Sequence, residues 1–385
     1  MKTLSQICEI VSDKLPVNEL INANLTSTYI STENMLPNKG GVVDPSSVPT
    51  TGKVTAYKTD DVLVSNIRPY FKKIWFASND GGCSNDVLVF RAKKDVSPEY
   101  LHYVLADDSF FDYAMKTSKG TKMPRGDKKA LMEYKIFEMD YSSQCQAAAI
   151  LNRIDDLIKT NTKINENLEQ QAQAIFKSWF VDFEPFGGAM PDDWKSANLL
   201  DVAEYLNGLA MQKYRPVDDE VGLPVLKIKE LRQGFCDDNS ELCSPNIKGD
   251  YIVQDGDVIF SWSGSLLVDF WCGGKCGLNQ HLFKVSSKSF DKWFYYIWTK
   301  YHLNRFIAIA ADMATTMGHI KREELSKAVV LIPSQSDYDR IGGLLAPLYD
   351  LVIANRIENR KLAALRDELL PQLMSGQLDV SEVDL

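Results

Sequence analysis

The chain has 385 residues, of which 45 % are hydrophobic and 25 % charged, and its formal net charge at pH 7 is −9. This composition excludes a disordered chain, and the length suffices for two domains with substantial cores. The first residues lack the apolar core of a signal peptide, and the longest apolar runs, such as 328–332, are too short to cross a bilayer. We therefore expect a cytoplasmic protein without membrane segments.

Residues 1 to about 140 predict a mixed region with strands. Short runs rich in Val, Ile, Phe and Tyr, such as 61–67 and 86–90, alternate with Gly, Pro, Asn and Asp turns. Residues 100–115 have a helical pattern and interrupt the strands.

A basic loop follows at 116–129, which contains six Lys and Arg residues and a single acidic residue, Asp127. Residues 51–135 together carry 15 Lys and Arg against 11 Asp and Glu, so this region is positive in an acidic chain. Such a loop could neutralise phosphates of a nucleic acid. A solvated surface loop explains the charge equally well.

A long amphipathic helix is predicted from about 144 to 180, because apolar residues recur there at helical spacing without glycine or proline. These residues are Ile150, Ile154, Leu157, Ile158, Ile164 and Leu168. Two glycines and two prolines at 184–191 end the helix and mark a domain boundary.

The second half repeats this order. It opens with 199–208, continues with strands around 251–285 and a helix near 291–310, and ends in a helix from about 336 to 374. The apolar face of that last helix is built by Leu344, Leu345, Leu348, Leu351, Val352, Leu362, Leu365, Leu369 and Leu373.

The halves also match at a nearly fixed offset. Asp156, Asn161 and Leu168 align with Asp350, Asn355 and Leu362 at an offset of 194 residues. Further matches are Cys83 with Cys276 and Phe90 with Phe283 at 193, Met123 with Met317 at 194, and 62–65 with 258–261 at 196. A constant offset indicates that one structural unit is used twice.

Each long helix has roughly 30 residues and a length of about 45 Å. An apolar stripe of that length needs a partner, and the nearest candidate is the helix of the other copy, in a two-helix coiled coil. That length is comparable with the spacing of paired half-sites on duplex DNA.

The seven cysteines predict no disulfide framework. Cys236, Cys243, Cys272 and Cys276 could be imagined as zinc ligands, but their spacings are not those of common zinc sites. Buried or neutral thiols are the favoured interpretation.

The arrangement of variable domain, long helix, variable domain and long helix resembles the specificity subunit of a type I restriction-modification system. The resemblance is carried by residues 120–180 and 317–376, by 256–261 and by 60–77, and it covers essentially the whole chain. It implies an α+β fold with two mixed α/β target recognition domains, separated by two long antiparallel helices in a coiled coil, with a pseudo-twofold internal repeat.

The domains expected from this resemblance are a first target recognition domain at 1–143, a first conserved spacer helix at 144–184, a second target recognition domain at 185–335, a second spacer helix at 336–376 and a C-terminal tail at 377–385.

The resemblance implies a non-catalytic DNA reader. Each variable domain would recognise one half of an asymmetric, bipartite sequence in double-stranded DNA. The implied partners are two methyltransferase subunits and restriction/translocase subunits. S-adenosylmethionine, ATP and Mg²⁺ would bind those partners, and no cofactor or metal is expected on this chain.

Motifs of catalysis point the same way, because the chain has no GxxxxGK[ST] loop and no methyltransferase-like NPPY tetrapeptide. Two alternatives remain open at this point: a self-contained nuclease or methyltransferase with an unfamiliar motif, and a two-headed coiled-coil scaffold that binds proteins.

Residue type and loop placement predict the following DNA contacts: Arg68, Lys72, Lys119, Lys122 and Arg125 in the first domain, and Trp262, Asn279, Gln280, His319, Lys321 and Arg322 in the second.

Overall fold

The computed structural model describes residues 1–22, 26–217, 219–312 and 318–380. It divides into two compact units: unit 1 contains Met1–Asp156 and Ala363–Leu385, and unit 2 contains Leu157–Leu362. The two longest helices, α6 (Tyr141–Phe176) and α12 (Gln335–Met374), each contribute residues to both units. Within the described ranges, no helix is both long and apolar enough to span a membrane.

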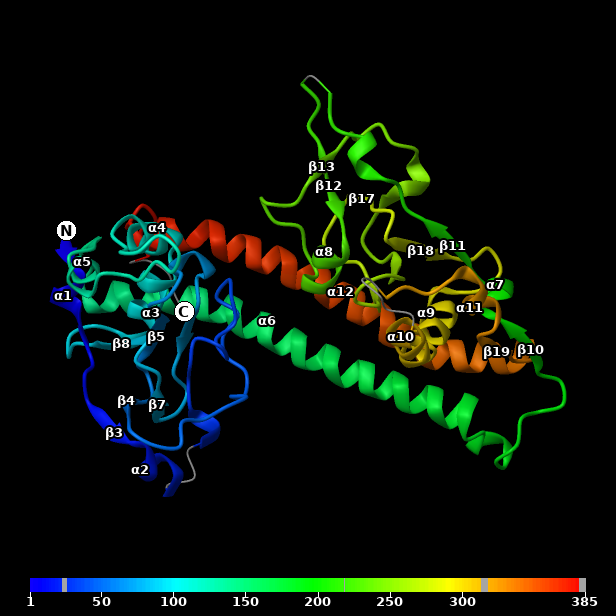
Figure 1. The fold of residues 1–385 in the computed structure, drawn as a ribbon, viewed down its shortest axis with the longest axis horizontal. Helices are drawn as coiled ribbons and strands as arrows, with labels where there is room; N and C mark the ends of the chain where they lie inside the picture. Colours follow the sequence, from blue (N-terminus) through cyan, green and yellow to red (C-terminus); the bar gives the residue numbers. More distant parts are fainter. Residues whose placement is uncertain (23–25, 218, 313–317, 381–385) are drawn as a thin grey trace. The chain divides into compact units, whose positions relative to one another are not determined.

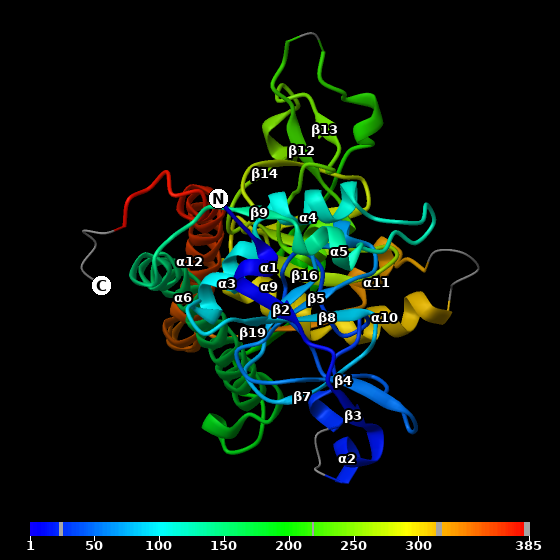
Figure 2. The same cartoon turned by 90° about the vertical axis from the view of Figure 1, so that its left-hand side faces the viewer.

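Unit 1 is built on small antiparallel sheets. The main sheet has the order β2 (Cys8–Ile10), β8 (Val87–Ala92), β5 (Val62–Ser65), β6 (Ile74–Phe76). A second sheet, with α2 (Val17–Asn22) at its end (Figure 2), has the order β3 (Lys14–Pro16), β4 (Lys53–Tyr57), β7 (Gly81–Cys83). The short strands β1 (Lys2–Thr3) and β9 (Lys135–Ile136) pair with each other. All four residues of β5 are buried, which explains why Val62, Leu63 and Val64 are apolar in succession instead of alternating with polar residues.

The helices of unit 1 cover the main sheet. Helix α3 (Pro98–Ala106) packs on β5, β6 and β8 (Figure 1), and α4 (Asp108–Lys116) follows it directly. The shorter helices are α1 (Leu4–Ile7) and α5 (Lys128–Met132). The prediction of a single helix over 100–115 was wrong, because Asp107 takes an extended conformation and its carboxylate accepts the Ser109 N–H as the cap of α4. Aspartate is favoured at that position over a helix interior.

Unit 2 repeats the strand order of the main sheet but has a different second sheet. Its main antiparallel sheet has the order β11 (Glu204–Asn207), β18 (Leu282–Ser286), β15 (Val258–Ser261), β16 (Leu267–Phe270). Its second sheet has the order β13 (Leu242–Cys243), β12 (Leu223–Leu226), β17 (Cys276–Leu278), β14 (Ile252–Val253), and β12 pairs with β17 in parallel. The strands β10 (Lys195–Asn198) and β19 (Val329–Ile332) form a third pair.

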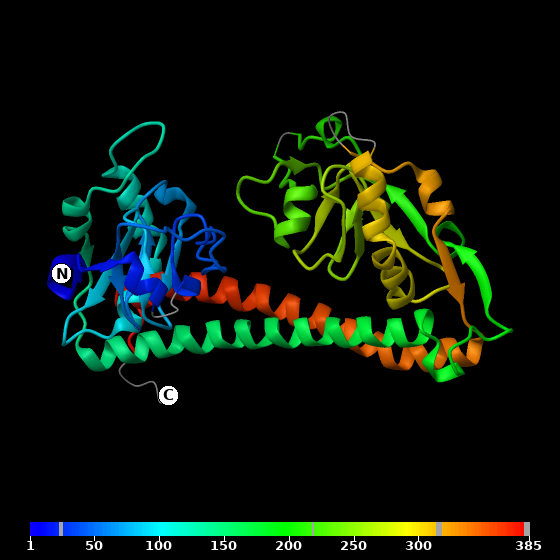
Figure 3. The same cartoon turned by 60° about the horizontal axis from the view of Figure 1, so that its bottom comes forward.

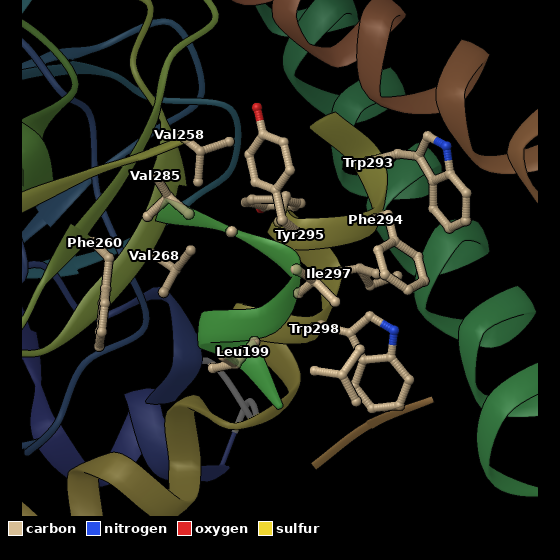
Figure 4. Close-up of a cluster of buried hydrophobic side chains, with 14 of the residues drawn as sticks. Leu199, Val258, Phe260, Val268, Val285, Trp293, Phe294, Tyr295, Ile297 and Trp298 are labelled. Carbon is tan, nitrogen blue, oxygen red and sulfur yellow. The ribbon is translucent and has the colours of Figure 1, made fainter. Parts of the chain in front are cut away.

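The helices of unit 2 follow the same scheme. They are α7 (Leu199–Val202), α8 (Ile228–Gln233), α9 (Lys292–Tyr301), α10 (Leu303–Asp312) and α11 (Arg322–Ser326), and α6 continues as a π-helical turn at Lys177–Val181. The helix predicted near 291–310 is again two helices, divided at the buried His302. The α9 residues Trp293, Phe294 and Trp298 lie on the side of the helix away from the strand residues Val258 and Val285 (Figure 4), where Phe294 and Trp298 contact Phe180.

The internal repeat is confirmed by the fold. Equivalent strands, β5 and β15, hold equivalent places in sheets of the same order, and they carry the matched sequences 62–65 and 258–261. The matched Cys83 and Cys276 lie on β7 and β17. Met317, which aligns with Met123, lies outside the described residues.

Within unit 2, α6 and α12 run side by side in antiparallel directions (Figure 3), since Asn161 contacts Asn359 while Asn165 contacts Asn355. The predicted apolar stripe was partly wrong. Several of its members are 40–52 % exposed, namely Leu157, Ile164, Leu344, Leu351 and Leu365. Buried asparagines occupy part of the helix contact instead.

Candidate nucleic-acid interface

The predicted residues of unit 1 gather on two loops that are joined through their backbones. The β5–β6 loop (66–73) contacts the α4–α5 loop (117–127): the Arg68 N–H donates to Pro124 O at 2.8 Å, and the Gly126 N–H donates to Asn66 O at 3.1 Å. The α4–α5 loop is closed by two reciprocal bonds between Lys119 and Arg125, at 2.9 and 3.0 Å. All five predicted cations of this half therefore lie on one joined surface.

The backbone of the β5–β6 loop is strained. Arg68 and Lys72 have φ values of 50° and 49°, on either side of the 3-10 turn Pro69–Phe71. Left-handed conformations are uncommon outside glycine and concentrate at functional sites. In addition, Arg68 Nε and Asn66 Oδ1 are buried without a hydrogen-bond partner within the described part of the chain. Such orphaned polar atoms require an explanation, and a ligand that supplies the missing partners is one.

Carboxylates hold most of these cations in place. Lys72 pairs with Asp108 at 2.8 Å, Lys119 with Asp127 at 2.5 Å, and Arg125 with Asp86 at 3.1 Å. Burial alone would raise the pKa of Asp108, but the hydrogen bonds from Lys72 and Lys39 outweigh it and lower that pKa. Lys119 and Arg125 remain 81 % and 56 % exposed.

Lys122 is also exposed, near the tip of the α4–α5 loop. Its position and those of Lys119 and Arg125 leave three cations of this loop accessible to a polyanion. The carboxylates reduce the net charge of the surface without covering it.

Unit 2 has the same joint between equivalent loops. The Gly264 N–H of the β15–β16 loop donates to Gly318 O at 2.8 Å, and the Ile320 N–H donates to Trp262 O at 3.1 Å. Ser263 and His319 form the accompanying β-bridge. The structure thus brings Trp262 and His319 together at the place that Asn66 and Arg125 hold in unit 1, and Gly264 takes the place of Arg68. Residues 313–317, which precede this joint, lie outside the described ranges.

The surface of this second site is aromatic rather than strongly charged. The Trp262 ring lies 6.2 Å from the rings of both His281 and His319, and its Nε1–H donates to Asn207 Oδ1 at 3.0 Å. His281 Nδ1 lies 3.0 Å from Ser263 Oγ. Aromatic faces and imidazoles can stack on or hydrogen-bond to nucleic-acid groups.

The other predicted residues of unit 2 have different surroundings. Gln280 is half-buried, and its Nε2 lies 3.4 Å from His281 Nε2. Asn279 is 3 % exposed, and its Oδ1 accepts the His281 N–H at 3.2 Å, so its side chain supports the turn. Lys321 and Arg322 are exposed at the start of α11, and Arg322 Nη1 donates to Tyr205 O at 3.3 Å.

Sequence reasoning missed the residues that hold the predicted ones. Asp86 and Asp108 pair with cations far away in sequence, and Asn207 and His281 position Trp262. The only sequence signal for these residues was their polar character next to a strand or helix end.

The cysteines that the structure describes do not gather into a metal site. Within the described ranges, no group of three or more His, Cys, Asp or Glu residues is arranged to hold a metal ion. A hydrogen bond from Cys276 lowers the pKa of Cys236, and burial raises the pKa of Cys272 to about 11. Cys236 and Cys276 thus contact each other instead of converging with Cys272 on an ion.

Comparison with known proteins identifies relatives over nearly the full chain. The sequence model of the family described as "Type I restriction modification DNA specificity domain" matches residues 1–170 and again 191–365. The MjaIX specificity subunit of a type I restriction enzyme from Methanocaldococcus jannaschii is 27 % identical over 76 % of this chain and 71 % of its own length. The HindI specificity subunit from Haemophilus influenzae is 22 % identical over 93 % of this chain and 95 % of its own.

A solved structure has the same fold. The crystal structure of a type I restriction-modification S subunit from M. genitalium superimposes with a TM-score of 0.56 at 13 % identity, covering 97 % of this chain and 95 % of that one.

Proposed function

The chain belongs to the type I restriction-modification DNA specificity family, and from this premise we propose that each of its two halves reads one part of a split, asymmetric DNA sequence. The chain is a DNA-recognition subunit and not the catalytic component of its system. The division into recognition domains at 1–143 and 185–335, spacer helices at 144–184 and 336–376 and a tail at 377–385 is part of this proposal.

One observation carries the proposal: the family match and the fold are both duplicated. Each unit presents a loop after the equivalent strand, β5 or β15, joined by backbone hydrogen bonds to the loop after α4 or α10. The two joined surfaces carry different side chains on the same backbone plan. Two different readers on one repeated scaffold suit a target made of two unlike parts.

The proposed contacts follow from the chemistry of each surface. In unit 1 the cations Arg68, Lys72, Lys119, Lys122 and Arg125 would bind phosphates and guanine edges. In unit 2 Trp262, Gln280, His319, Lys321 and Arg322 would contact the duplex, and Asn279 would hold the turn that presents Gln280.

The partners belong to the proposal as well. The chain would direct two methyltransferase subunits and the restriction/translocase subunits to the target. S-adenosylmethionine would bind the methyltransferase, and ATP and Mg²⁺ would bind the partners that translocate and cut DNA. A protein-binding scaffold is not favoured, because the family match extends over both halves.

The test is to co-express the chain with a methyltransferase subunit of its system and to map methylated adenines on a plasmid by single-molecule sequencing. We expect a split motif that disappears when this chain is omitted. A stable complex with an active methyltransferase that yields no motif would refute the proposal.

A further inference from the structure

Four asparagines of the long helices form two pairs that are copies of each other. Asn161 and Asn165 on α6 correspond to Asn355 and Asn359 on α12, both at an offset of 194. Asn355 Nδ2 donates to Asn165 Oδ1 at 2.9 Å, and Asn161 Nδ2 donates to Asn359 Oδ1 at 3.0 Å. Exchanging the two copies turns one pair into the other, so this asparagine quartet follows the internal repeat.

The quartet lies where the helix pair has no other buried contact. Between Leu157 and Gln171 of α6, Asn165 alone is buried, and between Ala354 and Leu362 of α12, Asn355 alone is buried. These two side chains are 6 % and 8 % exposed. An amide in such a position is unfavourable unless it is hydrogen-bonded.

Two side-chain amides of the quartet also reach the opposite backbone. Asn165 Nδ2 also donates to Val352 O at 3.3 Å, and Asn359 Nδ2 donates to Ile158 O at 3.3 Å. Asn161 Nδ2 has a further acceptor in Glu358, at 3.0 Å. The polar contact is therefore well satisfied in the observed register.

Displacing one helix along the other by one heptad, in either direction, would break the hydrogen bonds between these asparagines. In one direction Asn165 would face Leu348, Asn161 would face Val352 and Asn355 would face Ile158. In the other, Asn165 would face Leu362, Asn355 would face Ala172 and Asn359 would face Leu168. In that second register Asn161 would face Arg366, but every partner of the buried Asn165 and Asn355 is apolar, so both shifted registers would leave buried amides unpaired.

We propose that the asparagine quartet fixes the antiparallel register of α6 and α12 and is thereby a positioning element for the spacing between the two DNA contacts. The second part rests on the proposed function. Buried asparagines in other coiled coils specify register in this way and lower stability relative to apolar residues. The quartet would act through the helices and would not touch DNA.

Two substitutions separate this role from simple stabilisation. Replacing both Asn165 and Asn355 by Leu removes a matched amide pair, so the midpoint of thermal unfolding should stay unchanged or rise. Asn165→Leu alone leaves Asn355 unpaired and should lower the midpoint. The matched control is Asn167→Leu on the exposed side of α6, which should change neither the midpoint nor the register.

The register itself is measured as the distance between two spin labels by electron paramagnetic resonance. The labels are attached to cysteines that replace the exposed Lys163 and Leu344. The half-buried Cys145 and Cys236 are replaced by Ser so that they are not labelled. The protein with an intact quartet should give one distance. The N165L/N355L protein should add a population displaced by about 10 Å, the rise of one heptad. With the methyltransferase subunit bound, the same variant should add motifs whose spacer differs by about three base pairs.

A single unchanged distance in folded N165L/N355L protein would overturn the inference. If that variant does not fold, N161L/N359L, on the more exposed pair, provides the same test. Failure of the unaltered chain to read any split motif would instead refute the proposed function, and it is distinguishable because the distance measurement needs no DNA.

Discussion

Removing the cations of the α4–α5 loop should weaken DNA binding and lower its dependence on salt. Each phosphate contact of duplex DNA contributes about 0.9 to the slope of log K against log salt concentration. If Lys122 and Arg125 each make one contact, K122A/R125A lowers the slope by about 1.8. Between about 50 and 200 mM salt, the loss of affinity then becomes about 12-fold smaller than in the unaltered chain.

The assay is a fluorescence anisotropy titration of duplex DNA at several salt concentrations. Lys94→Ala is the matched control, because Lys94 is an exposed cation of unit 1 on the β8–α3 connection. It should leave the slope unchanged. Equal slopes for the unaltered chain and folded K122A/R125A would remove this loop from the interface.

The ion pair between Arg125 and Asp86 allows an opposite perturbation. Both side chains are more than a third exposed, so the pair contributes no more than about 1 kcal/mol. Asp86→Asn keeps the size of the side chain and releases Arg125. DNA affinity should rise by up to about fivefold. A fall in affinity with an unchanged fold would contradict the view that Asp86 competes with phosphate.

Trp262→Ala should weaken binding through unit 2 without changing the salt slope, because no charge is lost; a changed slope in the titration above would contradict this assignment. Asp61→Ala should destabilise the protein by about 3 kcal/mol in urea unfolding, because it leaves Arg91 without the buried carboxylate that accepts two of its hydrogen bonds, at 2.8 and 2.6 Å. The hydrogen bond from Arg360 lowers the pKa of Asp255, so this pair stabilises the fold above the unfolded pKa of about 3.9 and loses that contribution as the pH falls through the lower folded value. Asp255→Asn should therefore reduce the acid dependence of thermal unfolding below about pH 4, and an unchanged profile would show that the pair contributes nothing.

The elements that sequence predicted well are those set by local pattern. The strands β5 and β8 and both long helices follow from apolar runs and helical spacing, and the repeat follows from the constant offset. The helix breaks at Asp107 and His302 could not be predicted from the local pattern. Asp107 leaves the helix conformation, and His302 is buried by tertiary contacts.

The two candidate surfaces were predicted less completely, because their geometry arises from segments that are distant in sequence. Loop placement alone selected Arg125 and Trp262, but the backbone joint that brings them beside Arg68 and His319 forms across about 50 residues of sequence. The buried state of Asn279 was also invisible, since a polar residue in a turn is usually exposed.

The internal repeat predicts that the two units differ in how their DNA binding depends on salt. The backbone joint is the same in both units, and the asparagine quartet is common to both copies, so the duplicated features are those that position the surfaces. The side chains on the surfaces are not duplicated: unit 1 presents Lys119, Lys122 and Arg125, whereas unit 2 presents Trp262 beside two histidines and has Lys321 and Arg322 as its exposed cations. Contacts made by cations depend steeply on salt, and aromatic contacts depend on it little. Because unit 1 has more proposed cation contacts than unit 2, we expect the half of the target proposed for unit 1 to dissociate from the protein first as the salt concentration increases.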